Sequence, residues 1–211
     1  MRKNGFTIIE VIAVFLVILG VTFFILPMVL NNTKQAHFIS EWSETYSKME
    51  YITSVIRVQN DAELRKKFKK TQNNEVIAAI VLETIKPYLR IKTGVEQSQY
   101  KQHYMNKEPV KSWDKYYFDN FYLTEENQVV GLRWLNKNCH EKTVCGMLFF
   151  DLNGIKPPNT WGKDIFGINI LEKGIEPMGK NIDSGTLKGD CSNNGAGVYC
   201  SYFYLIGGDF E

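Results

Sequence analysis

The sequence predicts an α+β protein, in which a long N-terminal membrane-spanning helix packs on a globular domain built around an antiparallel β-sheet. Three observations lead to this prediction. The N-terminal region holds an apolar run of about 25 residues, which is long enough to cross a bilayer. An amphipathic helical pattern follows this run. The second half of the chain then holds four short segments rich in β-branched and aromatic residues, as strands are.

The apolar run extends over residues 6–30 and includes one ionisable side chain, Glu10. Roughly 20 helical residues suffice to cross a bilayer, so we expect residues 6–30 to form a membrane-spanning helix. An ordinary secretory signal has an apolar core of only about 7 to 15 residues. A carboxylate inside a span is unfavourable by up to roughly 3 kcal/mol at the bilayer centre, which predicts a cationic partner for Glu10.

The residues around Glu10 resemble a known processing signal. The segment 5–12, GFTIIEVI, is similar to the prepilin signal of the type IV pilin superfamily, which includes the pseudopilins of type II secretion systems. The resemblance implies that a prepilin peptidase cuts between Gly5 and Phe6 and that Phe6 is then N-methylated. The glutamate of the family stands fifth after the cut, as Glu10 does, and its helix-bending proline often stands twenty-second, as Pro27 does. The match covers roughly the first 35 residues.

The resemblance implies that Glu10 and Thr7 take part in subunit assembly. Cleavage would free an amine at Phe6, a cation that is as unfavourable in an apolar surrounding as the Glu10 carboxylate, so each is the natural partner of the other. The two groups lie within about one helical turn of a single chain, which leaves an intramolecular contact open. The resemblance favours the pairing of Glu10 in one subunit with the Phe6 amine of its neighbour, which would fix the axial register.

The function that the resemblance implies is that of a structural subunit in a type IV pilus-like filament or a type II secretion pseudopilus. Its partners would be the membrane, copies of itself or homologous pilins, the prepilin peptidase and, indirectly, the assembly platform and its ATPase. The alternative is a single-span, membrane-anchored extracytoplasmic binding protein that does not polymerise. Such a protein would keep its leader, residues 1–5.

Arg2 and Lys3 predict the orientation, because positive residues that flank a span stay on the cytoplasmic side. We therefore expect a protein of the inner, cytoplasmic membrane with a cytoplasmic N-terminus and an outer globular domain, which becomes periplasmic or extracellular after assembly. The 25 basic and 23 acidic residues give a net charge of +2, and loss of the leader removes both of these cations. This balance predicts no nucleic-acid partner.

The helix should continue beyond the apolar run. Side chains of the stripe recur every three or four residues, at Phe38, Trp42, Tyr46 (or Thr45), Met49, Ile52 and Ile56. Residues 31–58 should therefore form the amphipathic half of the same helix, whose stripe packs on the globular domain of residues 59–211. Proline removes one backbone donor, so a bend is expected at residue 27.

A second helix is predicted over residues 75–86, with Asn73 or Asn74 as its N-cap and Pro87 at its end. This helix should cover one side of the sheet. The basic segment 62–70 is interpreted as a solvated helix face. Residues 92–114 are polar and aromatic without a clear period, which indicates a long connection.

Four strands of an antiparallel meander are expected in the remainder of the chain, with turn residues between them. The strand segments are residues 116–123, 129–135, 144–152 and 165–171. Residues 199–206 are a candidate for one more strand. This α+β arrangement agrees with the pilin-like architecture that the N-terminus implies.

The chain has four cysteines, all in its outer part: Cys139, Cys145, Cys191 and Cys200. An even number in an exported domain favours disulfides, and three pairings are open. The nearest-neighbour pairing closes two short loops and would contribute roughly 2 to 3 kcal/mol for each. A zinc site is disfavoured, because its cysteines usually stand two to four residues apart. In the pilin family a C-terminal disulfide loop often lies on the filament surface, which residues 191–200 resemble, with an interior expected to be flexible and exposed.

The segment 151–164 is a candidate calcium loop. Asp151, Asn153 and Asp164 offer hard oxygen ligands, and major pseudopilins hold calcium in a loop near their last strands. The segment lacks the EF-hand arrangement of acidic residues. The alternative is a structural one, in which a tight turn is followed by a proline-stiffened excursion and Asp164 anchors the next element.

No enzymatic motif is present in the sequence. The three histidines, His37, His103 and His140, have no catalytic or metal-binding spacing, and the G-x-S-x-G, H-E-x-x-H and phosphate-loop patterns are absent. His140 stands beside Cys139, but a disulfide would remove the nucleophilic thiol. We therefore predict that the protein is not an enzyme and has no cofactor other than the candidate calcium.

Overall fold

The computed structural model describes residues 8–59, 73–118, 120–140 and 143–208. The chain divides into two compact units, Met1–His37 and Phe38–Glu211, and each is described by itself. The predicted cleavage residues Gly5 and Phe6, the predicted assembly residue Thr7 and the basic segment 62–70 lie outside the described residues.

Helix α1, Ile8–Gln59, begins in the first unit and ends in the second. It is 52 residues long, so a single continuous helix over both predicted halves is observed. The prediction that its first part spans a membrane is wrong. A membrane span must be both long and apolar, and no helix in the described ranges is long enough and apolar enough to cross a bilayer.

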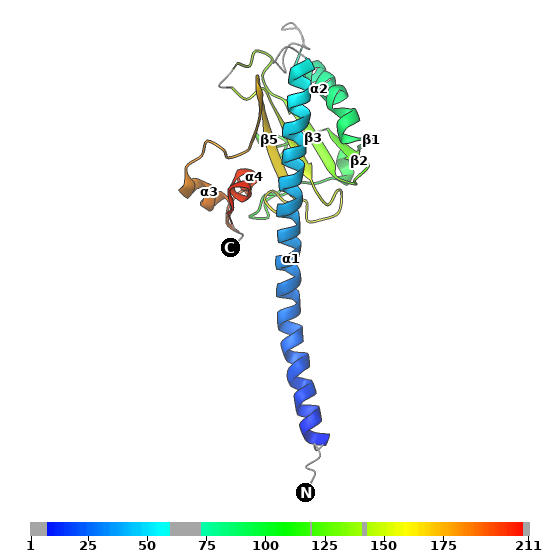
Figure 1. Cartoon of the computed structure of the whole chain (residues 1–211), viewed down its shortest axis with the longest axis vertical. Helices are drawn as coiled ribbons and strands as arrows, with labels where there is room; N and C mark the ends of the chain where they lie inside the picture. The colour runs from blue at the N-terminus through cyan, green and yellow to red at the C-terminus, as the bar shows by residue number, and fades with distance from the viewer. Residues whose placement is uncertain (1–7, 60–72, 119, 141–142, 209–211) are drawn as a thin grey trace. The chain divides into compact units, whose positions relative to one another are not determined.

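The second unit is built on a six-stranded sheet in which every neighbouring pair is antiparallel (Figure 1). The spatial order equals the chain order, so the sheet is a simple meander. Its strands are β1 Ile91–Val95, β2 Phe121–Thr124, β3 Val129–Trp134, β4 Gly146–Asp151, β5 Ile165–Leu171 and β6 Gly174–Pro177. The chain is therefore an α+β protein.

The four predicted strand segments correspond to β2, β3, β4 and β5, although β2 begins later than predicted. Strands β1 and β6 were not predicted, because each is short and contains glycine or proline. The candidate strand at residues 199–206 is helical instead and forms α4, Cys200–Phe203, followed by η3, Tyr204–Ile206. Two further short elements are η2, Gln97–Gln99, which lies in the predicted connection 92–114, and α3, Ser184–Asp190, where no element was predicted.

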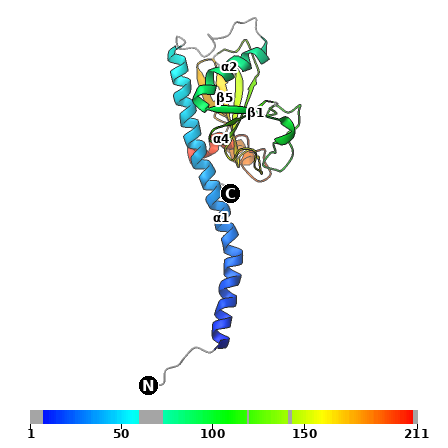
Figure 2. The ribbon, with the colours of Figure 1, turned by 90° about the vertical axis from the view of Figure 1, so that its right-hand side faces the viewer.

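The sheet buries both of its faces, because successive side chains of a strand point to opposite sides. One face packs against residues 38–59 of α1 and against α2, Asn74–Leu89. The other face packs against the segment that follows β1 and against Trp161. Figure 2 shows α1 on one side of the strands and the segment after β1 on the other. The buried strand side chains on the α1 and α2 face are Val130, Leu132, Leu148, Phe150, Phe166 and Ile168. Those on the opposite face are Val129, Met147, Phe149 and Ile165.

Helix α2 begins as predicted and ends later than predicted. The Asn73 side chain caps it by accepting a hydrogen bond of 2.8 Å from the Val76 N–H. Pro87 lies inside the helix rather than at its end. The end is set instead by Arg90, which adopts a left-handed φ of 49° while its N–H donates to the Lys86 carbonyl.

Trp42 fixes the amphipathic part of α1 to the sheet. The indole is fully buried and stacks on Phe166 of β5 with ring centroids 5.2 Å apart. Its Nε1–H donates a 2.7 Å hydrogen bond to the Ser201 carbonyl in α4. One side chain therefore joins three elements, and the predicted packing of the Phe38 to Ile56 stripe on the domain is observed.

Replacement of Trp42 by alanine tests this anchor. We expect Trp42→Ala to lower the free energy of unfolding by about 3 to 5 kcal/mol, because it removes a buried indole and orphans a buried carbonyl. Trp113→Ala is the matched control, since that indole is 77% exposed and its loss should change stability by no more than about 0.5 kcal/mol. Denaturant unfolding of both variants measures the difference, and equal losses would contradict the anchor.

Candidate functional site

The first part of α1 is the first candidate surface. Every described side chain from Ile8 to Leu30 is exposed within the chain. Six consecutive residues, 14–19, are large and apolar, and each is more than half exposed. Because successive helical residues point about 100° apart, six in a row cover the whole circumference of the helix. The segment 8–30 is therefore apolar on all sides, which is typical of a helix that packs among other helices.

Glu10 lies in the first turn of α1, where its carboxylate is close to the positive end of the helix dipole. Its predicted partner, the amine at Phe6, falls outside the described residues. The side chain of Pro27 is also outside them, so the bend at that position stays a prediction.

The four cysteines form two disulfides, Cys139–Cys145 and Cys191–Cys200. The prediction of disulfides is confirmed, and of the three pairings left open the nearest-neighbour one is observed. Among the described residues, the one group of at least three potential His, Cys, Asp or Glu metal ligands is Asp190 with Cys191 and Cys200. Both of its sulfur atoms belong to the disulfide, so neither is a thiolate ligand.

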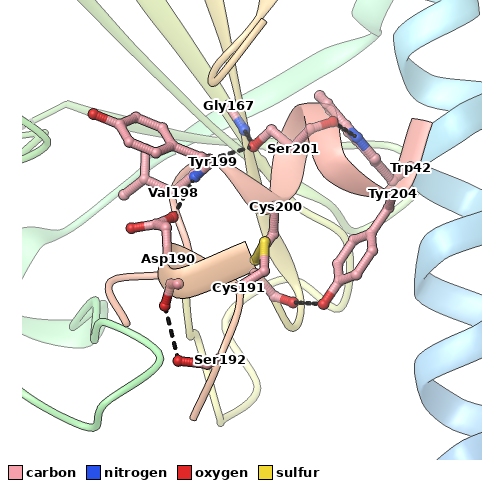
Figure 3. The surroundings of a disulfide bond; sticks show 12 residues. Trp42, Gly167, Asp190, Cys191, Ser192, Val198, Tyr199, Cys200, Ser201 and Tyr204 are labelled. Carbon is pink, nitrogen blue, oxygen red and sulfur yellow. Dashed lines mark hydrogen bonds between the residues drawn. A yellow bond between two sulfur atoms is a disulfide. The ribbon is translucent and has the colours of Figure 1, made fainter. Parts of the chain in front are cut away.

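The Cys191–Cys200 loop makes hydrogen bonds at its base and along its backbone (Figure 3). The Asp190 carboxylate accepts a 2.6 Å hydrogen bond from the Tyr199 N–H, and this contact closes the loop at its base. The loop carbonyls of Gly195 and Ala196 accept hydrogen bonds of 3.0 Å from the backbone of residues 105–106. The expected exposure is therefore wrong for most of the loop interior. Only Asn193 and Asn194 at its tip are fully exposed.

Ser201 links this loop to the sheet. Its hydroxyl donates to the Val198 carbonyl at 2.9 Å and accepts from the Gly167 N–H of β5 at 2.8 Å, while its carbonyl accepts from Trp42. Figure 3 shows these contacts beside the disulfide. The loop is thus held by the same residues that anchor α1.

The candidate calcium residues are brought together. Asp151 and Asp164 are fully buried, and the Asn153 Nδ2 donates to Asp164 Oδ2 at 3.0 Å. The Asn153 N–H donates to Asp151 Oδ1 at 3.2 Å. Asp164 also accepts hydrogen bonds from the backbone N–H groups of Asn159 and Thr160, at 2.9 and 2.5 Å. Asp164 therefore anchors the loop, as the structural alternative predicted.

Two further residues complete this carboxylate cluster. The Tyr100 hydroxyl donates to Asp151 Oδ2 at 2.6 Å. With its nitrogen facing Asp151, the Asn159 amide donates to Asp151 Oδ2 at 3.2 Å and to the Lys156 carbonyl at 2.6 Å. Sequence analysis did not assign these roles, because Tyr100 lies about 50 residues away and no local spacing connects it to Asp151.

Burial raises the pKa of both carboxyl groups. It raises the pKa of Asp164 to about 6, against the lowering effect of the Thr160 and Asn159 N–H donors. Burial and then the nearby Asp164 charge raise the pKa of Asp151 well above its usual range. Burial and the Asp151 charge also raise the pKa of Tyr100. The Tyr100 hydroxyl therefore remains a donor at neutral pH.

The cluster fits calcium only in part. Its oxygen ligands have the right chemistry, and Asn153 Oδ1 is buried with no hydrogen-bond partner in the described ranges. The carboxylate oxygens of Asp151 and Asp164, however, already accept hydrogen bonds from protein donors. Calcium takes about six to eight oxygen ligands, so binding would require these donors to give way. Calcium at this site stays a prediction, which titration calorimetry on the full-length chain tests.

No family model, curated protein or solved structure matches this chain.

Asp164 predicts a defined pH dependence. An aspartate with a raised pKa in the folded state binds its proton more tightly there than in the unfolded chain, so its contribution to stability is present at low pH and is lost as the pH rises through about 6. Relative to Asp164→Asn, the free energy of unfolding of the unmodified chain should fall by about 3 kcal/mol between about pH 4 and pH 7.

Asp183→Asn provides a control of opposite sign. The Asp183 side chain caps α3, and its hydrogen bonds with Thr186 lower its pKa. Its contribution to stability should therefore increase with pH through the acidic range. Urea unfolding of the three proteins at several pH values measures both trends, and parallel curves for all three would contradict the account.

Proposed function

We propose that the chain is a structural subunit of a filament of the type IV pilus or type II secretion pseudopilus kind, assembled through the first part of α1. The observation that supports the proposal best is the segment 8–30, whose described side chains are exposed and apolar around the whole helix. Packing against the same segment of other copies would remove that surface from water. The segment 5–12 supports the same proposal through its resemblance to the prepilin signal.

The energetics favour such packing. Full burial of one large aliphatic or aromatic side chain contributes about 1.5 to 3 kcal/mol. Association costs on the order of 4 to 15 kcal/mol in lost motion. The exposed apolar side chains of residues 8–30 are numerous enough to offset that cost several times over.

In the proposed filament, Glu10 gives the packing its register. Apolar surfaces slide past each other at little cost, whereas a buried carboxylate and a buried amine must meet. The proposed partner of Glu10 is the amine of Phe6 in a neighbouring subunit, freed when the prepilin peptidase cuts after Gly5. Methylation of that amine would leave it cationic.

The outer domain would lie outside the cytoplasm. Two disulfides in one domain of this size fit an oxidising compartment, where such bonds persist. The rival proposal is a binding protein that does not polymerise. It predicts one copy per particle, whereas the filament proposal predicts ordered rods.

Substitution of Glu10 tests the filament proposal. We expect Glu10→Ala to accumulate normally in its native cells but to reduce filament yield at least tenfold, because loss of one partner from a buried ion pair costs about 3 to 5 kcal/mol. Sheared filaments counted by electron microscopy and quantified by immunoblot give the yield. Glu44→Ala is the matched control, because Glu44 is an exposed glutamate of the same helix. Unchanged assembly of Glu10→Ala would refute the pairing.

A further inference from the structure

An exposed tryptophan lies in a loop of the outer domain. The side chain of Trp113 is 77% exposed, whereas the other three tryptophans of the chain are at most 6% exposed. The Trp113 loop, residues 111–117, belongs to the long segment between β1 and β2. Two turn hydrogen bonds shape it, from the Asp114 N–H to the Lys111 carbonyl at 2.9 Å and from the Tyr117 N–H to the Asp114 carbonyl at 3.1 Å. None of the residues assigned to assembly or to calcium belongs to this loop.

The backbone of the Trp113 loop is held by the sheet. The Arg133 side chain of β3 shares its Nη1 among three carbonyls of the loop, at distances of 2.9 to 3.2 Å. These carbonyls belong to Asp114, Lys115 and Tyr117. The Asp114 carboxylate accepts a 2.9 Å hydrogen bond from the Lys111 N–H, so it is engaged by the backbone of its own loop. Because the loop is already fixed, it presents Trp113 to a ligand at little further cost in conformational entropy.

Two lysines accompany the exposed indole. Lys111 Nζ lies 5.5 Å from the ring centroid of Trp113, and Lys115 Nζ lies 5.1 Å from that of Tyr116. Aromatic faces attract cations, which favours these positions of the two ammonium groups. The ion pairs of the described residues include neither lysine. The loop therefore presents two cations beside an open aromatic ring.

This combination fits one class of anionic polymer better than others. A nucleic acid carries a phosphate at every nucleotide and is bound along a basic patch or stripe, whereas this chain has 25 basic and 23 acidic residues. An anionic membrane surface is recognised by clusters of about four to eight basic residues, and the Trp113 loop has two. An acidic polysaccharide combines a sugar ring, whose C–H face is apolar, with single carboxylates. Such units match one exposed indole flanked by two cations.

We propose that the Trp113 loop binds an acidic polysaccharide with carboxylates on its sugar rings. The C–H face of one sugar packs on the Trp113 indole, because the negative partial charge of an aromatic face attracts C–H groups. Carboxylates of that sugar and of its neighbour form charge-assisted hydrogen bonds with the ammonium groups of Lys111 and Lys115. The sugar hydroxyls stay in water, so this recognition requires no enclosed cavity. The proposal concerns the outer domain and goes beyond the proposed assembly.

Tryptophan fluorescence tests the proposal with the full-length chain. The three other indoles are buried, so a soluble ligand changes chiefly the emission of Trp113. We expect oligogalacturonate to shift this emission to shorter wavelength with roughly millimolar affinity, and added salt to weaken the binding. Neutral maltooligosaccharide lacks the carboxylates and polyglutamate lacks the sugar rings, so each should bind at least tenfold more weakly. No shift with oligogalacturonate, or equal affinity for all three, would overturn the proposal.

Two other anionic ligands test the rival classes. Oligothymidylate presents bases and phosphates, and phosphatidylglycerol vesicles present an anionic membrane surface. Phosphatidylcholine vesicles correct for lipid contact that does not depend on charge. Tighter binding of oligothymidylate or of phosphatidylglycerol vesicles than of oligogalacturonate would overturn the proposal in favour of a nucleic acid or a membrane.

Substitution of the two lysines locates the binding. Lys111→Gln combined with Lys115→Gln removes both cations and keeps the indole, so the affinity for oligogalacturonate should fall at least tenfold. Lys92→Gln combined with Lys188→Gln is the matched control, because it removes the same charge from two exposed lysines outside the loop. Trp113→Ala should cause a similar loss, measured by saturation-transfer NMR. Unchanged affinity in either loop variant would contradict the assignment. The result does not depend on whether the chain forms filaments.

Discussion

The exposure of the first part of α1 is the constraint on which our account of the chain depends. Between Ile8 and Leu30 the helix is apolar around its circumference, and every described side chain there is exposed within the chain. From Phe38 onward the same helix has only an apolar stripe, which is buried on the sheet through Trp42, Met49 and Ile52. One helix therefore has two different packing requirements. The second is met inside the chain, and the first calls for partners, which we propose are copies of the same helix.

Buried hydrogen bonds fix the loops of the outer domain, whose positions apolar packing alone would not determine. The Asp164 carboxylate accepts hydrogen bonds from backbone N–H groups of its loop, and the Asp151 carboxylate accepts one from the buried Tyr100 hydroxyl. Ser201 ties the Cys191–Cys200 loop to β5 and to Trp42.

The sequence predicted those features that depend on neighbours in the chain. Continuous β-branched and aromatic runs predicted β2 to β5, and the Asn73 cap predicted the start of α2. The even number of cysteines predicted disulfides but left their pairing open. Features that depend on distant residues were missed. Residues 199–206 have the composition of a strand, but their contacts with Trp42 and β5 hold them as helix. Tyr100 lies in a segment without periodicity, and only the fold places it beside the carboxylate loop. The expected membrane span was wrong, since no helix of the described residues is long and apolar enough to cross a bilayer.

Processing of the N-terminus is the step on which the proposed assembly depends, because the amine that would partner Glu10 exists only after a cut between Gly5 and Phe6. The intact mass of the chain purified from its native cells measures this directly. The account predicts a chain that lacks its first five residues and carries one added methyl group at Phe6. A chain that begins at Met1 would contradict it.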